Sequence, residues 1–417
     1  MVRAGTLVLS HGRRASCETR SVPYARAVDE IQAKVDEIER LLVGHTDRRD
    51  EAQILDLLAG ASADELDGIF RFLDASRLLG DIDDRVLGPN HETRLIELLS
   101  RDRIEDLSVP VRADLICAFS RYRTSSGQER GIRDVLLATR GRALTELKNA
   151  LDRGVDHRDL QHIVFSDIDD DSIRDDILSH LAREAASLPR SEVKVLSDID
   201  DTFYCNWKDK RFPAKTVYPG VLQLYFELDR GPNATPGRLG DVAFVTARPK
   251  DRTGFVEAAT HETLRALGLA ECTVLAGSFL KLHGNEAIAE RKLDNFRDYS
   301  QLFGEYDFVF LGDSGQGDAS FGAAMHDVAP GRVSAVFIHD VVRTDAVARG
   351  EWAERGVVFF DTYIGAALAA RELGLIEPEG PKRVADAAFA AFASIAFEDT
   401  ERRDARRAEL DADAARL

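Results

Sequence analysis

From residue 193 onward, short apolar runs alternate with stretches of helical periodicity, and this alternation is the feature that most constrains the fold. The runs are VKVLSD (193–198), DVAFVTA (241–247), TVLAG (273–277), DFVFLGD (307–313), VSAVFIHD (333–340) and VVFFD (357–361). The stretches read as helices are 220–230, 252–267, 287–303 and 363–373. Apolar strands separated by helices are typical of a parallel sheet covered on both faces. We therefore predict a Rossmann-like three-layer α/β/α domain over residues 191–375.

The residues before 193 have a different sequence pattern, with apolar side chains at helical spacing and few β-branched runs. Glu51 opens EAQILDLL, which is echoed by ERGIRDVL beginning at Glu129. Because two such units would bury faces that neither covers alone, we expect an all-helical repeat domain over 47–185. Residues 1–46 are expected to form a leader and a first helix. The leader is Arg-rich and resembles a transit peptide faintly, and an unstructured leader is the interpretation we favour.

The tetrapeptide Asp-Ile-Asp-Asp occurs three times, at 81–84, 167–170 and 198–201. The first two copies lie between helical stretches, where aspartate accepts hydrogen bonds from free backbone N–H groups, so we expect them to cap helices. A calcium loop there would need further oxygen ligands, which neither copy has. Only the third copy follows a predicted strand.

Residues 376–417 are predicted to form an Ala-rich helical tail that packs back on the body. A helix lying on a membrane surface would need a basic polar face, and this tail is acidic. The chain has 417 residues and a formal net charge of −18, which argues against broad nucleic-acid binding. Four widely spaced cysteines indicate neither a disulfide scaffold nor a zinc knuckle, and no apolar run is long enough to span a membrane. We expect a cytoplasmic protein, with peripheral attachment to membranes left open.

Polar side chains follow the predicted strands, at the sheet edge where open α/β folds bind ligands. Asp198 and Asp200 follow the first strand and Asp313 closes the fourth. Three carboxylates at one edge cannot all stay ionised without a cation, so we expect Mg²⁺ there. The hydroxyl of Thr246 and the ammonium of Lys292 could hold the oxygens of a phosphoryl group beside it.

This ordered set resembles the haloacid-dehalogenase superfamily of aspartate-nucleophile phosphatases. The order is DxDxT, a strand-end Thr, a Lys and then GDxxxxD, and it ends at Asp318. The runs YPGV (218–221), TARP (246–249) and LGDSGQGD (311–318) resemble the catalytic domain of the fungal actin-patch-associated phosphatidate phosphatase family. The resemblance covers roughly residues 193–375.

The resemblance implies a role for each matched residue. Asp198 would be the nucleophile, and Asp200 the acid that protonates the leaving oxygen and then activates water. The metal would be held by Asp198, Asp200 and Asp313, with Asp318 as a second-shell or alternate ligand. Substrate phosphate would be bound by the residues Thr202, Thr246, Arg248 and Lys292.

Several alternatives stay open in the sequence. Lys281 competes with Lys292 for the lysine role, and we favour Lys292 because it lies on a helix shortly before the fourth strand. Arg248 is as well explained as a surface residue. His339 and His283 are expected to be structural, and Asp201 to be a solvated or capping acid.

The segment 203–217, directly after the nucleophile, contains Trp207, Phe212 and four basic residues. It could be a flap that closes the site or faces an anionic lipid headgroup, or an ordinary structured loop. The function predicted is magnesium-dependent phosphomonoester hydrolysis through an aspartyl-phosphate, with phosphatidate at a membrane surface as the implied substrate. The alternative is an adaptor whose helical repeats dock on a membrane or a protein partner and recruit a phosphatase domain.

Overall fold

The computed structural model describes residues 21–44, 46–82, 90–121, 124–152, 159–190, 192–233, 242–249, 262, 264, 266, 273–277 and 285–417. The chain forms two compact units, Met1–Phe119 and Ser120–Leu417. The sheet and the helices that follow residue 120 belong to the second unit. The domain boundaries expected from the sequence stay predictions.

The described part of the first unit is helical. Its elements are α1 (Ser21–Leu41), α2 (Arg48–Gly60), α3 (Ala63–Phe72), α4 (Ala75–Asp81), α5 (His91–Glu97), η1 (Leu98–Asp102), η2 (Ile104–Asp106) and α6 (Val109–Ser120). Helix α3 begins with a capping box, in which Ser62 and Glu65 satisfy each other's backbone N–H groups. The core contains Ile38, Leu58 and Leu66 from three of these helices.

The second unit opens with helices that repeat part of the first. They are α7 (Ser126–Ala138), α8 (Gly141–Asp152), α9 (Leu160–His162), η3 (Ile163–Asp167) and α10 (Asp171–Ser187). Helix α7 lies at the positions expected from α2 and the sequence repeat. Glu51 and Glu129, which correspond in the repeat, are both buried. Glu129 accepts from the backbone of Asp169 and Asp170, and Asp170 caps α10, which confirms the capping prediction for that copy of the tetrapeptide.

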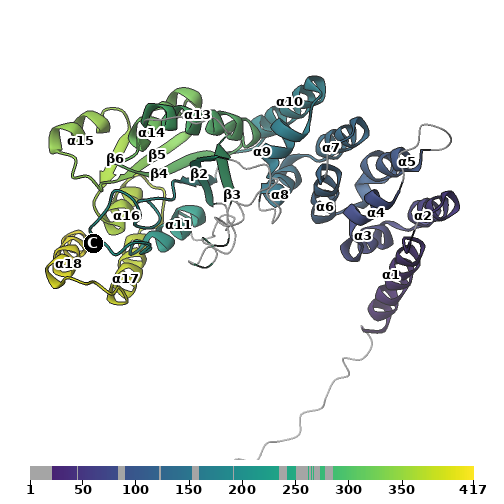
Figure 1. Ribbon diagram of the computed structural model, residues 1–417, viewed down its shortest axis with the longest axis horizontal. Helices are drawn as coiled ribbons and strands as arrows, with labels where there is room; N and C mark the ends of the chain where they lie inside the picture. The colour runs from purple at the N-terminus through teal and green to yellow at the C-terminus, as the bar shows by residue number, and fades with distance from the viewer. Residues whose placement is uncertain are drawn as a thin grey trace, which may run out of the picture. The chain divides into compact units, whose positions relative to one another are not determined.

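A parallel sheet of six described strands forms the centre of the second unit (Figure 1). The strands are β1 (Val193–Ser197), β2 (Val242–Pro249), β3 (Thr273–Gly277), β4 (Asp307–Asp313), β5 (Val333–His339) and β6 (Val357–Phe360). They lie in the order β3-β2-β1-β4-β5-β6, and every pair is parallel. After β3 the chain returns to the other side of β1, so the order reverses between β1 and β4. In open α/β sheets ligands bind at the carboxyl ends of strands at such a reversal.

Helices cover both faces of this sheet, as the sequence predicts (Figure 1). On one face α11 (Val221–Arg230) and α16 (Tyr363–Glu372) pack on inward side chains such as Val195 and Phe337. On the other, Phe296 of α13 (Asn285–Leu302) packs against Phe308, and Phe321 of α14 (Asp318–Val328) against Phe310. Helix α15 (Ala346–Ala353) connects β5 to β6. The fold is therefore a helical N-terminal region followed by a three-layer α/β/α arrangement.

The C-terminal tail is helical and packs on the body, as expected, and it forms two helices. They are α17 (Gly380–Ala393) and α18 (Thr400–Ala414). Phe392 and Leu410 join Leu368 of α16 in one buried cluster. The break is explained by Asp399, whose side chain accepts from Glu401 N and starts a new helix.

Helix α8 is tied to the sheet by buried polar contacts. Lys148 Nζ donates to Glu305 Oε2 and to the carbonyl of Leu302, both at 2.7 Å. Asp152 accepts from Tyr299 at 2.6 Å and from Lys194, a buried lysine in β1, at 3.3 Å. Burial lowers the pKa of Lys148 and is opposed by Glu305. These charges are satisfied only while α8, α13 and β1 stay together.

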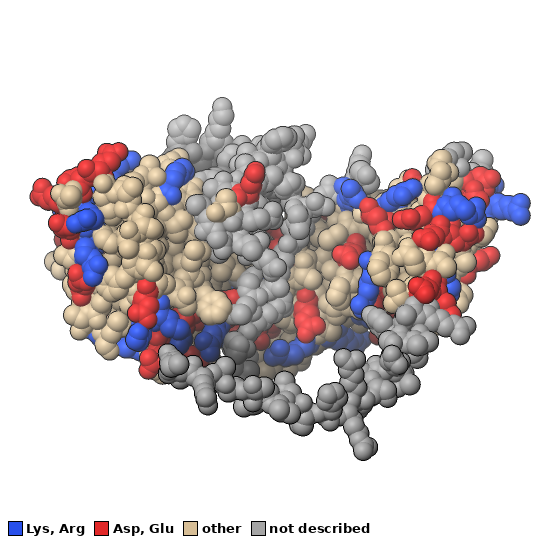
Figure 2. Space-filling view, turned by 90° about the horizontal axis from the view of Figure 1, so that it is seen from below, with Lys and Arg blue, Asp and Glu red and all other residues tan. Residues whose placement is uncertain are grey.

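Acidic and basic side chains are interspersed on the described surface that Figure 2 shows. The described residues on this face form no broad basic area of the kind that nucleic acid requires.

We predict that Lys148→Met lowers the free energy of unfolding of the second unit by about 3–5 kcal/mol, because it leaves Glu305 buried without its cation. The double variant Lys148→Met/Glu305→Leu should lose less, since both charges are removed. Urea unfolding followed by tryptophan fluorescence reports this unit, because both tryptophans of the chain, Trp207 and Trp352, lie in it.

Lys382→Met serves as the control, because Lys382 forms an exposed ion pair with Asp386 and should lose under about 1 kcal/mol. Equal losses for Lys148→Met and the double variant would contradict the charge argument.

Candidate active site

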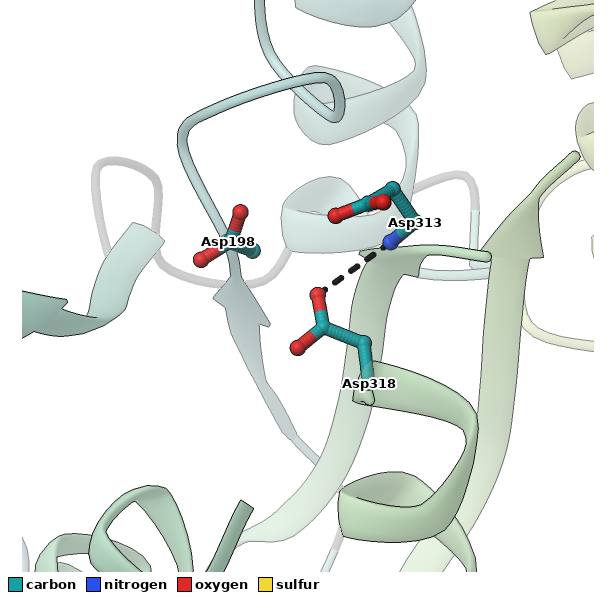
Figure 3. A group of neighbouring side chains, drawn as sticks. All are labelled: Asp198, Asp313 and Asp318. Atoms are coloured by element: carbon teal, nitrogen blue, oxygen red, sulfur yellow. Dashed lines mark hydrogen bonds between the residues drawn. The ribbon is translucent and has the colours of Figure 1, made fainter. Parts of the chain in front are cut away.

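Three aspartates meet at the carboxyl ends of β1 and β4 (Figure 3). Asp198 follows β1, Asp313 ends β4, and Asp318 opens α14. All three are buried, and one carboxylate oxygen from each lies within 4.8 Å of the others. The sequence predicted that Asp198 and Asp313 would meet at this edge, and the structure brings them together.

The backbone explains why these side chains converge. The N–H of Asp198 donates to the carbonyl of Leu311, which extends the pairing of β1 and β4 by one residue. Asp318 folds back so that its Oδ2 accepts from the N–H of Asp313 at 3.2 Å. A β-carbon at Gly312 would lie 2.6 Å from the Asp318 carboxylate, so only glycine allows this close approach.

Lys292 supplies the cation of this cluster. It lies on α13, and its Nζ donates to Asp198 Oδ1 at 2.7 Å and to Asp318 Oδ1 at 2.6 Å. The side chain is almost fully buried. Burial alone would lower the pKa of Lys292, but the two carboxylates outweigh it and hold the pKa above its ordinary value. The competing Lys281 lies outside the described residues.

One ammonium does not balance three carboxylates. Burial raises the pKa of Asp198 to about 7, and the neighbouring charge of Asp318 adds to the rise while Lys292 opposes it. Burial, Asp318 and Asp198 raise the pKa of Asp313 well above its usual range. Crowded oxygen donors with surplus negative charge are what a hard divalent cation requires.

Two amide side chains that the sequence analysis did not single out fix the remaining polar groups. Gln316 Nε2 donates to Asp313 Oδ2 at 3.2 Å and to the backbone carbonyl of Asp200 at 3.3 Å. Asn206 Nδ2 donates to Asp200 Oδ1 at 2.8 Å. The carbonyl of Asp200 thus lies near the three aspartates, while its partly exposed side chain lies outside that group. Gln316 lies within GDSGQGD, three residues after Asp313, and this closeness in the sequence is the signal that could have identified it as a site residue.

Of the other candidate phosphate binders, the structure describes the side chain of Thr202 only. Thr202 is buried, and its hydroxyl has no partner within the described part of the chain. Thr246 and Arg248 are in the last residues of β2, at the same sheet edge, and their side chains lie outside the description. His283 also lies outside it.

Asp201 is buried, so of the two roles expected for it the structure agrees with capping and not with a solvated acid. Its φ of 61° is in the left-handed region. Its carboxylate accepts from the backbone N–H groups of Asn206, Trp207, Lys208 and Asp209. The segment 203–217 is therefore a closely held loop, with Trp207 exposed.

His339 has the surroundings of a structural residue. It is buried, its Nδ1 lies 3.1 Å from the carbonyl of Asp201, and its ring stacks on Phe360. Burial and the guanidinium of Arg211 lower its pKa to about 4, so it is neutral at physiological pH.

These acids, the lysine and the parallel sheet agree with one family comparison. Residues 193–340 match the family described as phosphatidate phosphatase APP1, catalytic domain. The match confirms the resemblance to an APP1-type catalytic domain and indicates a phosphatase domain. It spans every candidate site residue, from Asp198 to Asp318. Comparisons with curated proteins and with solved structures give no significant match.

Helices long and apolar enough to cross a bilayer are absent from the part of the chain that the structure describes.

We predict that Asp313→Asn raises the free energy of unfolding in EDTA, by about 1–2 kcal/mol, because it removes one buried like charge. Lys292→Met should lower it by about 3–5 kcal/mol, because two carboxylates lose their cation. Urea titrations of both variants at neutral pH measure the two effects. A Lys292→Met protein that is more stable than the wild type would show that Lys292 does not compensate the charge of Asp198 and Asp318.

Proposed function

We propose that the chain is a magnesium-dependent phosphomonoester hydrolase whose substrate class is phosphatidate. The observation that carries the proposal is the buried group of Asp198, Asp313 and Asp318 with Lys292, inside the segment that matches the APP1 catalytic domain. Lipid specificity is supported by the match to a family of phosphatidate phosphatase catalytic domains.

The donor set fits Mg²⁺. All three side chains offer carboxylate oxygens, their oxygens are within reach of one ion, and the cluster contains three acidic groups and one ammonium. Asp198, Asp313 and Asp318 would hold the ion, together with the carbonyl oxygen of Asp200. When bound, it would neutralise charge on the phosphoryl oxygens.

The residues of the chain account for two displacements at phosphorus. In the first, a carboxylate oxygen of Asp198 bonds to phosphorus, the bond from phosphorus to the substrate alkoxide oxygen breaks, and Asp200 donates its proton to that oxygen. In the second, Asp200 takes a proton from water, the water oxygen bonds to phosphorus, and the acyl phosphate bond breaks. Inorganic phosphate leaves and Asp198 is restored as a carboxylate.

The environments of the two acids suit these different roles. Asp198 is buried beside Lys292, whose ammonium favours the ionised carboxylate that attack requires. Asp200 is partly exposed and is held by Asn206, so it can exchange protons with the leaving group and with water. Lys292 would also contact the transferring phosphoryl group, along with Thr246, Thr202 and Arg248.

We predict that Asp198→Asn lowers kcat by at least about 10³-fold on every phosphomonoester the enzyme hydrolyses, because an amide cannot form the acyl phosphate. Phosphate release is measured with Mg²⁺ or EDTA from phosphatidate in mixed micelles and from soluble phosphomonoesters. Asp294→Asn, an exposed acid on the same helix as Lys292, is the control.

An Asp198→Asn enzyme with full activity would refute the nucleophile. Release from soluble esters alone would keep the phosphatase and refute the lipid substrate. No release from any ester would refute the hydrolase and favour the adaptor alternative.

We predict that 10 mM Mg²⁺ raises the Tm of the wild-type chain relative to EDTA, since a ligand bound only by the folded state stabilises it by about 2.7 kcal/mol at 100 times its Kd. Asp313→Asn should lose most of this shift, and Asp294→Asn should keep it. Equal shifts in both variants would place the magnesium elsewhere.

A further inference from the structure

Two loops border the aspartate cluster at the carboxyl edge of the sheet. The first, residues 206–210, follows Asp198, and the second, residues 341–344, follows β5. We call these two loops together the rim. Both lie against the turn after Asp313. The Lys208 side chain packs on Gly315, and Ser314 Oγ accepts from the N–H groups of Val341 and Val342.

Each loop of the rim is fixed by a buried aspartate. Asp201 accepts from the backbone of the first loop, as described above. Asp340 accepts from Thr344 N at 2.8 Å and Val342 N at 3.3 Å, and Arg349 balances its charge. The backbone that carries the exposed side chains of the rim is therefore fixed.

Backbone strain is concentrated in the same region. Among the described residues, three other than glycine have φ in the left-handed region: Asp201 at 61°, Lys215 at 65° and Arg343 at 63°. Asp201 comes shortly before the first loop, Lys215 shortly after it, and Arg343 lies in the second loop. Strain of this kind costs about 1–3 kcal/mol per residue and is concentrated at functional sites.

The rim exposes apolar and cationic side chains together. Trp207 is 64% exposed and Val342 is 51% exposed, although both are large apolar residues. Lys208, Lys210 and Arg343 are also exposed. Within the described part of the chain, no carboxylate forms an ion pair with Lys208 or Lys210.

The acids of the rim do not cancel this positive charge. Asp209 is buried and is bound by Arg211 and the hydroxyl of Tyr218. Asp340, at the start of the second loop, is buried as well. Exposed Asp345 follows the second loop, and Glu409 lies near enough to Arg343 to interact with it, so among the described residues the unpaired positive charge of the rim is that of Lys208 and Lys210.

We propose that the rim binds the surface of an anionic phospholipid bilayer. Trp207 and Val342 would enter the interface between headgroups and acyl chains, where tryptophan is favoured, while Lys208, Lys210 and Arg343 contact lipid phosphates. The catalytic cluster would then face the membrane. This inference rests on the proposed lipid phosphatase function and adds how the site reaches its substrate.

Charge and continuity favour a membrane over a protein partner. The rim directly adjoins the group that would act on a lipid headgroup, and exposed Trp with Lys is the combination that interfacial surfaces use. A rim that served a protein would give no response to protein-free vesicles.

The first test uses the two tryptophans. In a Trp352→Phe background, Trp207 is the sole tryptophan, and its emission can be excited selectively over that of tyrosine. Vesicles of phosphatidylcholine with 20% phosphatidylglycerol should shift its emission to shorter wavelength, and lipids brominated near the headgroup should quench it. Pure phosphatidylcholine vesicles should give a much smaller response, and 0.5 M NaCl should reverse most of the binding. No shift and no quenching on anionic vesicles would overturn the proposal.

The second test measures vesicle binding by sedimentation. Trp207→Ala and the double variant Lys210→Gln/Arg343→Gln should each weaken binding by about tenfold or more. The controls are Leu373→Ala, an exposed apolar residue after α16, and Arg190→Gln, a basic residue that pairs with Asp307 at the amino end of β4. Equal binding by rim and control variants would also overturn the proposal.

Activity separates this inference from the proposed function. Trp207→Ala should lose activity on phosphatidate in vesicles but keep its kcat/KM on dioctanoyl phosphatidate below its critical micelle concentration. Loss on both substrates would mean that Trp207 acts within the site and not through the membrane. A chain that binds vesicles and hydrolyses neither substrate would refute the proposed function and keep the membrane surface.

Discussion

The ion pairs that Lys292 makes with Asp198 and Asp318 are the contacts on which the site depends. They cross from α13 to the end of β1 and the start of α14, so one buried ammonium joins three elements that are far apart in the chain. Three carboxylates could not be buried together at the reversal point of the sheet without it. The surplus negative charge that remains is also what makes the cluster suitable for a divalent cation. The same excess of carboxylates thus lowers the stability of the fold and makes the cluster suited to bind a divalent cation.

A second principle appears in the loops around this cluster, where buried aspartates bind backbone N–H groups. Asp201 and Asp340 each replace the regular hydrogen bonds that a strand or helix would give to a loop. The loops can therefore be irregular, and even strained, while remaining fixed. Acids that look alike in the sequence therefore have two roles. Asp201 and Asp340 bind backbone N–H groups of loops, whereas those of the aspartate cluster are available for a ligand.

The fold could be predicted from the sequence because its signals are local. Apolar runs, helical spacing and the repeat between Glu51 and Glu129 predict strands and helices without any knowledge of distant contacts. The meeting of Asp198 with Asp313 followed from parallel strands ending at one edge. The choice of Lys292 over Lys281 rested on its place in a helix before β4, and the structure brings Lys292 to the cluster.

The remaining features depend on tertiary geometry. Asp201 stands in a tetrapeptide of similar acids, and only its left-handed φ and its buried carboxylate distinguish it from a solvated residue. Asn206 lies in no motif, and Gln316 occupies a variable position of GDxxxxD, so neither amide could be assigned a role from the sequence. The second helix of the tail begins after Asp399, whose capping role is shown only by its hydrogen bond from Glu401 N.

The buried contacts of α8 with Lys194 and Glu305 have a consequence for how the protein is made. Helix α8 leaves the ribosome before β1 and α13. Its contacts with α9 and α10 join residues that are close in the sequence, so α8 can form early. The first strand of the sheet then emerges beside a partner that already offers Asp152 for its lysine. Because synthesis proceeds from the N-terminus, α8 with Asp152 is made before β1, whose Lys194 pairs with it. The segment matched by the family begins only at residue 193, so its boundaries do not mark the unit that folds.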